Sequence, residues 1–309
     1  ACTAENILMV SGSQQGLDLA GKVFLEPGDL VVCENPTYLA ALTVFRSYEC
    51  GLLPIETDDD GMVPEDLERK LAANPKARLM YIIPSFQNPT GRTWSLERRR
   101  KILEIAQRYE LPILEDNPYG ELRYEGQTIP TLKSMDTTGV VTYMGSFSKV
   151  LSPGIRLGWM LASRELIEKY ESAKECADLQ ASTLTQMVVD TYLAHNDLDE
   201  NIRRLNELYR GRRDKMLALL AAEFPEGSRW THPCGGLFLW ATLPEGIDTD
   251  ALLPITVAHK AAYIPGRAFF ADGDECRCLR LNFSNASEAQ MEQGIAIMGQ
   301  VFRDALAKG

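Results

Sequence analysis

The sequence predicts an α/β protein: a mainly parallel sheet with helices on both faces, followed by a smaller C-terminal domain of the α+β type. Two observations carry this prediction. Up to residue 162, short apolar runs alternate with helical patterns, and most runs are apolar at every position, as expected of strands covered on both faces. Beyond residue 163 the chain changes to two long helical patterns, short alternating strands and a last helix.

The apolar runs give the order of the predicted strands. In the first part they cover residues 6–10, 30–34, 52–56, 78–83, 111–115, 140–144 and 157–162. Between them lie helical patterns over 13–25 and 95–109, the second with a Ser-x-x-Arg start. The later part contains helices over 164–194 and 197–224, strands over 236–243 and 278–284, and a helix over 287–307. We expect a large domain of residues 1–205 and a small domain of residues 206–309.

The charge balance argues against a nucleic-acid-binding protein. The 309 residues include 32 Lys and Arg against 43 Asp and Glu, a formal net charge of -11. The one dense basic cluster, residues 98–101, opens an amphipathic segment, and we interpret it as a solvated helix face. No stretch is long and apolar enough to span a membrane. We therefore expect neither nucleic acid nor membrane as a partner of this segment.

The cysteines indicate reduced thiols and a cytoplasmic protein. Seven are scattered along the chain, an odd number, and most lie inside apolar segments. Two pairs could suggest a metal, His232 with Cys234 and Cys276 with Cys278, but neither has the spacing of a zinc knuckle. The sequence therefore predicts no metal site.

Chemically distinctive residues follow four of the predicted strands. Ligands of such sheets gather at the carboxyl ends of the strands, so these loops should lie together. "SGSQQG" follows the first strand, and its exposed helix-start amides suit an anion. "PSFQNPTG" (84–91), "EDNPYG" (115–120) and "GSFSKVLSPGIRLGW" (145–159) follow the fourth, fifth and sixth. The residues that stand out are Gly12, Ser13, Gln14, Asn88, Asp116, Tyr119, Ser146, Ser148, Lys149 and Arg156.

Pyridoxal 5'-phosphate (PLP) would use all four loops. It needs an amine for its aldehyde, an acid for its ring nitrogen, donors for its ring oxygen, a face to stack on and a phosphate cradle. Lys149 can supply the amine, and Asp116 can pair with the ring nitrogen. Asn88 and Tyr119 can donate to the ring oxygen, and Tyr38, which follows the second strand, can offer its ring face.

The phosphate cradle draws on two of these loops. Gly12 frees the backbone before a helix, and an arginine fork matches phosphate geometry. We expect the cradle to contain Gly12, Ser13, Gln14, Ser146, Ser148 and Arg156.

The joint pattern resembles the fold-type-I PLP-dependent aminotransferases of classes I and II. It consists of NPTY, NPTG, D-x-x-Y, then S-x-S-K and R-x-G, in that order and at similar gaps. The wordings "SGSQQGLDL", "IPSFQNPTG" and "GSFSKVLSPGIRLGW" are most similar to the branch with 2-aminoadipate and kynurenine aminotransferases. The resemblance covers essentially the whole chain.

The resemblance implies a transaminase with PLP as its cofactor. It would move an amino group between an amino acid and a 2-oxo acid by a ping-pong mechanism, with glutamate and 2-oxoglutarate as one pair. Lys149, Asp116 and Tyr119 would be catalytic. Arg280 would clamp the substrate α-carboxylate with help from Asn88, although an arginine on an exposed strand face is the simpler interpretation. The family also implies a homodimer with shared active sites and an N-terminal segment upstream of Ala1.

Two other functions stay open at this point. A PLP-dependent lyase or decarboxylase is compatible with the same residues, because the fold does not select the reaction. The chain could also be the ligand-sensing part of a transcriptional regulator with a helix-turn-helix module upstream.

Overall fold

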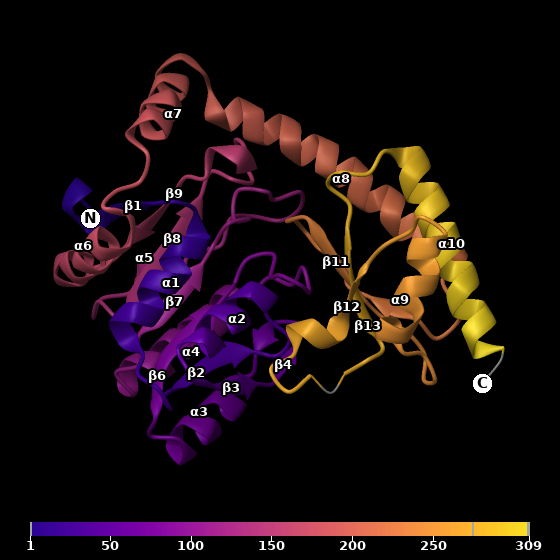
Figure 1. The fold of residues 1–309 in the computed structure, drawn as a ribbon, viewed down its shortest axis with the longest axis horizontal. Coiled ribbons are helices and arrows are strands. Elements are labelled where there is room, and N and C mark those ends of the chain that lie inside the picture. Colours follow the sequence, from indigo (N-terminus) through magenta and orange to yellow (C-terminus); the bar gives the residue numbers. More distant parts are fainter. Residues whose placement is uncertain (1, 274, 308–309) are drawn as a thin grey trace.

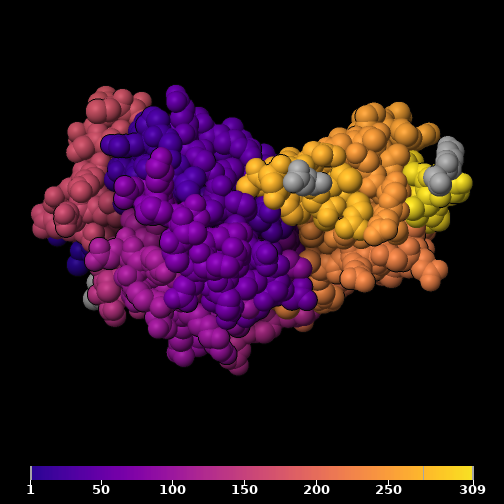
Figure 2. Space-filling model, turned by 90° about the horizontal axis from the view of Figure 1, so that it is seen from below, coloured from indigo at the N-terminus to yellow at the C-terminus, as the bar shows by residue number. Residues whose placement is uncertain are grey.

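The computed structural model describes residues 2–273 and 275–307. Figure 2 shows two lobes of unequal size, with the C-terminal residues forming the smaller one. The expected α/β architecture with a smaller C-terminal α+β part is confirmed (Figure 1). Every strand that the sequence predicts is present, with ends that differ by at most two residues.

The large lobe is built on a seven-stranded sheet with the order β1-β9-β8-β7-β6-β2-β3. The strands are β1 (Ile7–Val10), β2 (Leu30–Glu34), β3 (Gly51–Ile55), β6 (Ala77–Ile82), β7 (Ile113–Asp116), β8 (Val141–Ser146) and β9 (Gly158–Leu161). Neighbours from β8 to β3 are parallel, whereas β9 is antiparallel to both β8 and β1. β1 therefore runs in the same direction as the parallel strands, and its carboxyl end lies at the same edge.

The strand register brings the first and sixth loops together. Val10 at the end of β1 and Ser146 at the end of β8 both lie opposite Gly158 on β9. A side chain at Gly158 would crowd the Gly145 carbonyl oxygen, 2.8 Å from an added Cβ. The absence of that side chain lets the residues before β9 lie between the ends of β1 and β8.

Helices cover both faces of this sheet, as its continuously apolar strands predict. One face packs against α1 (Ser13–Phe24), α2 (Leu39–Ser47) and α6 (Arg164–Asp178), and the other packs against α3 (Pro64–Ala73), α4 (Leu96–Arg108) and α5 (Leu132–Met135). β6 shows the alternation: Tyr81 belongs to the first core, and Met80 and Ile82 belong to the second.

The small lobe is a four-stranded sheet backed by helices. Its strands are β10 (Arg229–Trp230), β11 (Phe238–Thr242), β13 (Cys278–Asn282) and β12 (Ile264–Pro265), in that order. Its helices are α8 (Leu198–Glu223), α9 (Thr249–Ala258) and α10 (Glu288–Leu306). Leu239 and Leu281 point into the core with α8 and α10. Because side chains alternate along a strand, Phe238 and Arg280 lie on the opposite face, toward the large lobe.

The sequence patterns did not reveal several short elements. These are η1 (Ala4–Asn6), α2, β4 (Thr57–Asp58), β5 (Gly61–Met62), α3, α5, η2 (Pro153–Ile155), β10, α9, β12 and η3 (Gly266–Phe269). Most are too short to show a period of their own.

The single helix expected over 164–194 is wrong, because two helices occupy that stretch. α6 ends at Asp178, where Leu179 adopts a left-handed φ of 63°, and α7 (Thr183–His195) begins after Ser182. The Ser182 side chain caps α7 by accepting a hydrogen bond from the Thr185 amide. In the sequence, Ser182 was the available signal that a new helix begins inside this stretch.

The boundary between residues 205 and 206 stays a prediction. It falls inside α8, which runs from the large lobe to the small one (Figure 1). Asn201 donates to the Val150 carbonyl, and Asn206 donates to the Glu121 carbonyl. α8 therefore contacts the large lobe on both sides of the predicted boundary.

The interpretation of residues 98–101 as a solvated face is wrong for Arg99, which is fully buried. Arg99 donates hydrogen bonds to the carbonyls of Trp94, Pro84 and Pro130 and to the Ser85 hydroxyl. Burial lowers the pKa of Arg99 to about 10. The guanidinium thus ties α4 to the start of the loop that carries Asn88.

We expect Arg99→Met to lower the free energy of unfolding by roughly 2–4 kcal/mol, because several buried acceptors lose their donor. Denaturant unfolding measures the change. Arg100→Met is the matched control, since Arg100 is exposed on the same helix and should stay within about 0.5 kcal/mol of the wild type. Equal effects of the two variants would contradict the role given to Arg99.

Candidate active site

One cavity of about 310 Å³ lies at the carboxyl ends of the large sheet. It brings together nearly all the residues that the sequence predicted to bind the cofactor. Its lining includes Ser13, Gln14, Tyr38, Asn88, Asp116, Tyr119, Ser146, Ser148, Lys149 and Arg156. Gly12 adjoins this lining at the start of α1. Arg280 comes from the small lobe and contacts Asn88.

The helix start at α1 forms an anion site. Gly12 has a φ of 83°, which favours glycine, and a Cβ there would collide with the Arg156 guanidinium. The Ser13 hydroxyl is buried and has no partner among the described residues. The first amides of a helix point outward without intrahelical partners and favour negative charge. This end of the cavity therefore offers donors to an anion.

Arg156 completes that site from the turn before β9. Its backbone is left-handed, with a φ of 49°, and its Nη1 lies 3.4 Å from the Ser148 hydroxyl. The Ser146 hydroxyl accepts a hydrogen bond from the Ser148 amide at 3.1 Å. No acidic side chain of the described part of the chain pairs with Arg156 within 4 Å. Its positive charge is left for a ligand.

Asp116 lies at the buried end of the cavity, as the last residue of β7. Its Oδ2 accepts a hydrogen bond from the Tyr81 hydroxyl at 2.9 Å, whereas its Oδ1 has no partner among the described residues. Burial raises the pKa of Asp116 to about 7, although the Tyr81 hydrogen bond and the Lys149 charge oppose that rise. The free oxygen suits a cationic donor.

Sequence reasoning missed Tyr81. It lies inside a predicted strand, and its ring belongs to the core, packed edge-on against Phe45. A buried tyrosine hydroxyl usually needs a hydrogen-bond partner, so a tyrosine inside a continuously apolar strand was a usable signal.

Lys149 is half-buried in the turn after β8. Burial lowers the pKa of its amine, and the nearby charges of Arg156 and Arg280 lower it further. Asp116 has the opposite effect. A lower pKa increases the fraction of neutral amine, which is the nucleophilic form.

Arg280 reaches the site from β13 of the small lobe. Its Nη1 donates to Asn88 Oδ1 at 2.8 Å, which orients the Asn88 amide group to donate elsewhere. Its Nε is buried without a partner in the described part of the chain. The simple alternative, an arginine on an exposed strand face, does not fit this half-buried position between the lobes.

The cavity fits PLP by the chemistry of its free groups. Asp116 Oδ1 is an unpaired acceptor for a protonated ring nitrogen, and the Ser13 hydroxyl and Arg156, which line the same cavity, form an anion site. Lys149 lines the same cavity and could hold the aldehyde carbon. Tyr119 and Asn88 could hold the ring oxygen, and Tyr38 lies with them.

No helix in residues 2–273 and 275–307 is long and apolar enough to cross a membrane. Within the same residues, no group of three or more His, Cys, Asp or Glu side chains could hold a metal ion.

Comparison with known proteins gives a consistent family. The model of the family "Aminotransferase class I and II" matches residues 1–297. Aromatic-amino-acid aminotransferase 1 of Thermococcus litoralis is 45% identical over 98% of this chain and 74% of that protein. The crystal structure of Pyrococcus horikoshii kynurenine aminotransferase with PMP superposes with a TM-score of 0.95 at 43% identity, over 99% of this chain and 77% of that one.

A regulator also matches. An uncharacterized HTH-type transcriptional regulator of Bacillus subtilis, YisV, is 31% identical over 96% of this chain, which covers 61% of the regulator. The expected resemblance to kynurenine and 2-aminoadipate aminotransferases is confirmed. The chain belongs to the class I and II aminotransferases and is a transaminase of fold type I that uses pyridoxal 5'-phosphate.

Proposed function

We propose that this transaminase exchanges an amino group between glutamate and 2-oxoglutarate on one side and an aromatic amino acid and its 2-oxo acid on the other, by a ping-pong mechanism. The names of two relatives, an aromatic-amino-acid and a kynurenine aminotransferase, support the aromatic pair. The observation that carries the chemistry is one cavity whose lining includes Lys149, Asp116 and the anion site of Ser13 and Arg156.

Lys149 has two roles in this proposal. It holds the cofactor covalently until a substrate amine displaces it, and it then takes the proton from the substrate Cα and later returns a proton. Its lowered pKa supports both roles, because a neutral amine is needed for each. When bound, PLP supplies the electron sink that makes this Cα proton acidic.

The other residues bind the cofactor and stabilise the charges on its ring. Asp116 keeps the ring nitrogen protonated, and the hydrogen bond from Tyr81 fixes which carboxylate oxygen is available. Tyr119 and Asn88 stabilise negative charge at the ring oxygen, and Tyr38 covers a ring face. The phosphate is bound by Gly12, Ser13, Gln14, Ser146, Ser148 and Arg156.

Arg280 binds the substrate carboxylate. It has a free buried Nε and no acidic partner within 4 Å among the described residues. A guanidinium fork pairs with a carboxylate through two parallel hydrogen bonds. Asn88, which accepts from Arg280 Nη1, assists from the large lobe.

The active form is a homodimer with shared active sites. α7 presents an apolar surface, in which Leu184, Met187 and Val188 expose 73%, 63% and 54% of their area. Exposed apolar side chains gathered on one helix indicate an interaction site. Analytical ultracentrifugation of the full-length protein tests this proposal: a dimer supports it, and a monomer at micromolar concentration contradicts it.

Initial-rate kinetics test the reaction type. With glutamate and the 2-oxo acid of phenylalanine as the two substrates, double-reciprocal plots should be parallel, because the first product leaves before the second substrate binds. Intersecting lines, or carbon dioxide or ammonia as the main product, would contradict the proposal.

Asp116 should make the cofactor-free protein lose stability as the pH rises. The carboxyl titrates near 3.8 when unfolded and near 7 when folded. Between these values the folded protein holds a proton that the unfolded chain has released, so the free energy of unfolding falls with rising pH. Asp116→Asn removes this contribution. Between pH 5 and pH 7, the free energy of unfolding of the variant should rise by about 2 kcal/mol relative to that of the wild type. A difference independent of pH would contradict the burial argument.

Lys149 should carry the cofactor. Borohydride reduces the carbon–nitrogen double bond between a lysine and PLP to a single bond that no longer hydrolyses, so peptide mapping of the reduced holoenzyme should find the label on Lys149. Lys149→Ala should take up no label under the same conditions. A label on any other lysine would overturn the assignment.

Arg280→Ala should lower kcat/KM by roughly two to four orders of magnitude for amino-acid and 2-oxo-acid substrates alike, because two charged hydrogen bonds of about 1.5–3 kcal/mol each are lost. Arg280→Lys should recover only part of the lost kcat/KM, since an ammonium group lacks the planar fork of the guanidinium. PLP affinity is the control and should hardly change. Loss of the cofactor, or intact turnover, would contradict the role.

A further inference from the structure

We propose that Phe238 and Phe269 are positioning residues for Arg280: their rings hold the guanidinium by cation–π contact and leave its charge free for the substrate carboxylate. The inference rests on the proposed role of Arg280 and adds what orients it.

The two rings are the main partners of the Arg280 cation. The guanidinium carbon lies 4.2 Å from the centre of the Phe238 ring and 5.1 Å from that of the Phe269 ring. Both distances fall within the range of cation–π attraction. The side-chain hydrogen bond to Asn88 has a neutral acceptor. Within residues 2–273 and 275–307, no carboxylate lies within 4 Å of Arg280.

Both rings are held in place by other aromatic residues. Phe238 is 6% exposed and packs edge-on against Tyr119, with ring centres 5.6 Å apart. Phe269 is fully buried and packs edge-on against Trp240 at 5.7 Å. Because the rings are fixed, contact with them restricts the guanidinium to one position, although the arginine side chain is flexible by itself.

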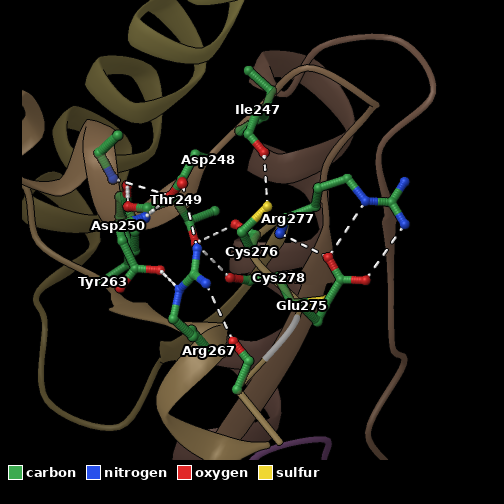
Figure 3. Close-up of polar contacts among 12 residues, drawn as sticks. Ile247, Asp248, Thr249, Asp250, Tyr263, Arg267, Glu275, Cys276, Arg277 and Cys278 are labelled. Carbon is green, nitrogen blue, oxygen red and sulfur yellow. Dashed lines mark hydrogen bonds and ion pairs between the residues drawn. The ribbon is translucent and has the colours of Figure 1, made fainter.

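The turn that carries Phe269 is fastened inside the small lobe. Figure 3 shows Arg267, two residues earlier in η3, pointing toward the start of α9. Its Nε donates to Asp250 at 3.0 Å, and its Nη1 donates to the Gly273 carbonyl at 3.2 Å. The Thr249 hydroxyl of the same helix start donates to the Cys278 carbonyl of β13 at 2.9 Å. The turn that carries Phe269 and the strand that carries Arg280 are thus both hydrogen-bonded to the start of α9.

The Phe269 backbone also joins the two lobes. Its carbonyl accepts a hydrogen bond from the Thr37 amide at 2.9 Å, next to Tyr38 in the cavity lining. A second hydrogen bond between the lobes runs from the Ala271 amide, which donates to Asn35 Oδ1 at 3.0 Å. The segment that carries Phe269 is therefore fastened to the loop that borders the cofactor site.

The chemistry favours rings over an acid at this place. A carboxylate partner would neutralise Arg280 and compete with the substrate for its donors. An aromatic face stabilises the cation without supplying a hydrogen-bond acceptor, so the N–H groups in the guanidinium plane stay available. Arg280 is half-buried, and this burial lowers its pKa; cation–π attraction is strongest for such a partly desolvated cation.

The first test measures carboxylate binding to the full-length holoenzyme. The probes are 3-phenylpropionate and glutarate, which resemble the two proposed amino acids but have no amino group to react. Phe269→Leu and Phe238→Leu keep apolar volume and remove the ring face. Each should weaken binding of both probes by roughly tenfold and raise KM more than it lowers kcat. PLP affinity should be retained.

Phe302→Leu is the matched control. Phe302 is also fully buried in the small lobe, but it packs against Phe224 and Tyr263 in the core. It should lower stability without changing the affinity for either probe. Equal loss of probe binding in all three variants would show a general packing effect and overturn the proposal.

A second test separates ring electrostatics from shape. Site-specific replacement of Phe238 by phenylalanines with one, two and three ring fluorines weakens the negative face and barely changes the volume. Probe affinity should fall stepwise with each fluorine, whereas an unchanged affinity would overturn the proposal. If Arg280→Ala leaves probe binding intact, the proposed role of Arg280 fails. If Arg280→Ala abolishes binding but the ring variants and fluorination have no effect, only this inference fails.

Discussion

The carboxylate of Asp116 sets the conditions for the rest of the site. It lies at the end of a central parallel strand, where water is excluded, and it has one hydrogen-bond donor for two oxygens. An ionised carboxylate in such a place is costly unless a cation pairs with it, and its pKa of about 7 expresses that cost. In the proposed arrangement, a protonated ring nitrogen of the cofactor would relieve this cost at Asp116 Oδ1. Stability and cofactor binding would then be linked through this one residue.

The charges around this carboxylate form a pattern that the whole chain does not have. The protein carries a formal net charge of -11, yet at the site Lys149 lies near two further cations, Arg156 and Arg280, and one carboxylate, Asp116. The two arginines have no acidic partner within 4 Å among the described residues. A dianionic phosphate and a substrate carboxylate would supply the missing negative charge. Burial lowers the pKa of Lys149, and the charges of Arg156 and Arg280 lower it further, so in the proposed mechanism the two arginines would favour proton transfer as well as binding.

Much of this arrangement follows from local sequence. The apolar strands and the residues after each of them could be located, because parallel strands place their carboxyl ends at one edge and each loop has a distinctive composition. Lys149, Asp116 and Asn88 line one cavity for this reason. The contacts that come from tertiary packing could not be located. Tyr81, Phe269 and the buried Arg99 do not reveal their partners in the sequence. Tyr81 bonds to Asp116 and Arg99 bonds to Ser85, 35 and 14 residues away, and Phe269 faces Arg280, 11 residues later on another element.

The most direct measurement is a crystal structure of the full-length holoenzyme. We expect each unpaired polar group of the cavity to bind a particular part of PLP. The account predicts continuous density from Lys149 Nζ to the cofactor, the ring nitrogen within hydrogen-bond distance of Asp116 Oδ1, and the phosphate between the start of α1 and Arg156. A ring nitrogen turned away from Asp116, or a phosphate bound at another place, would contradict it.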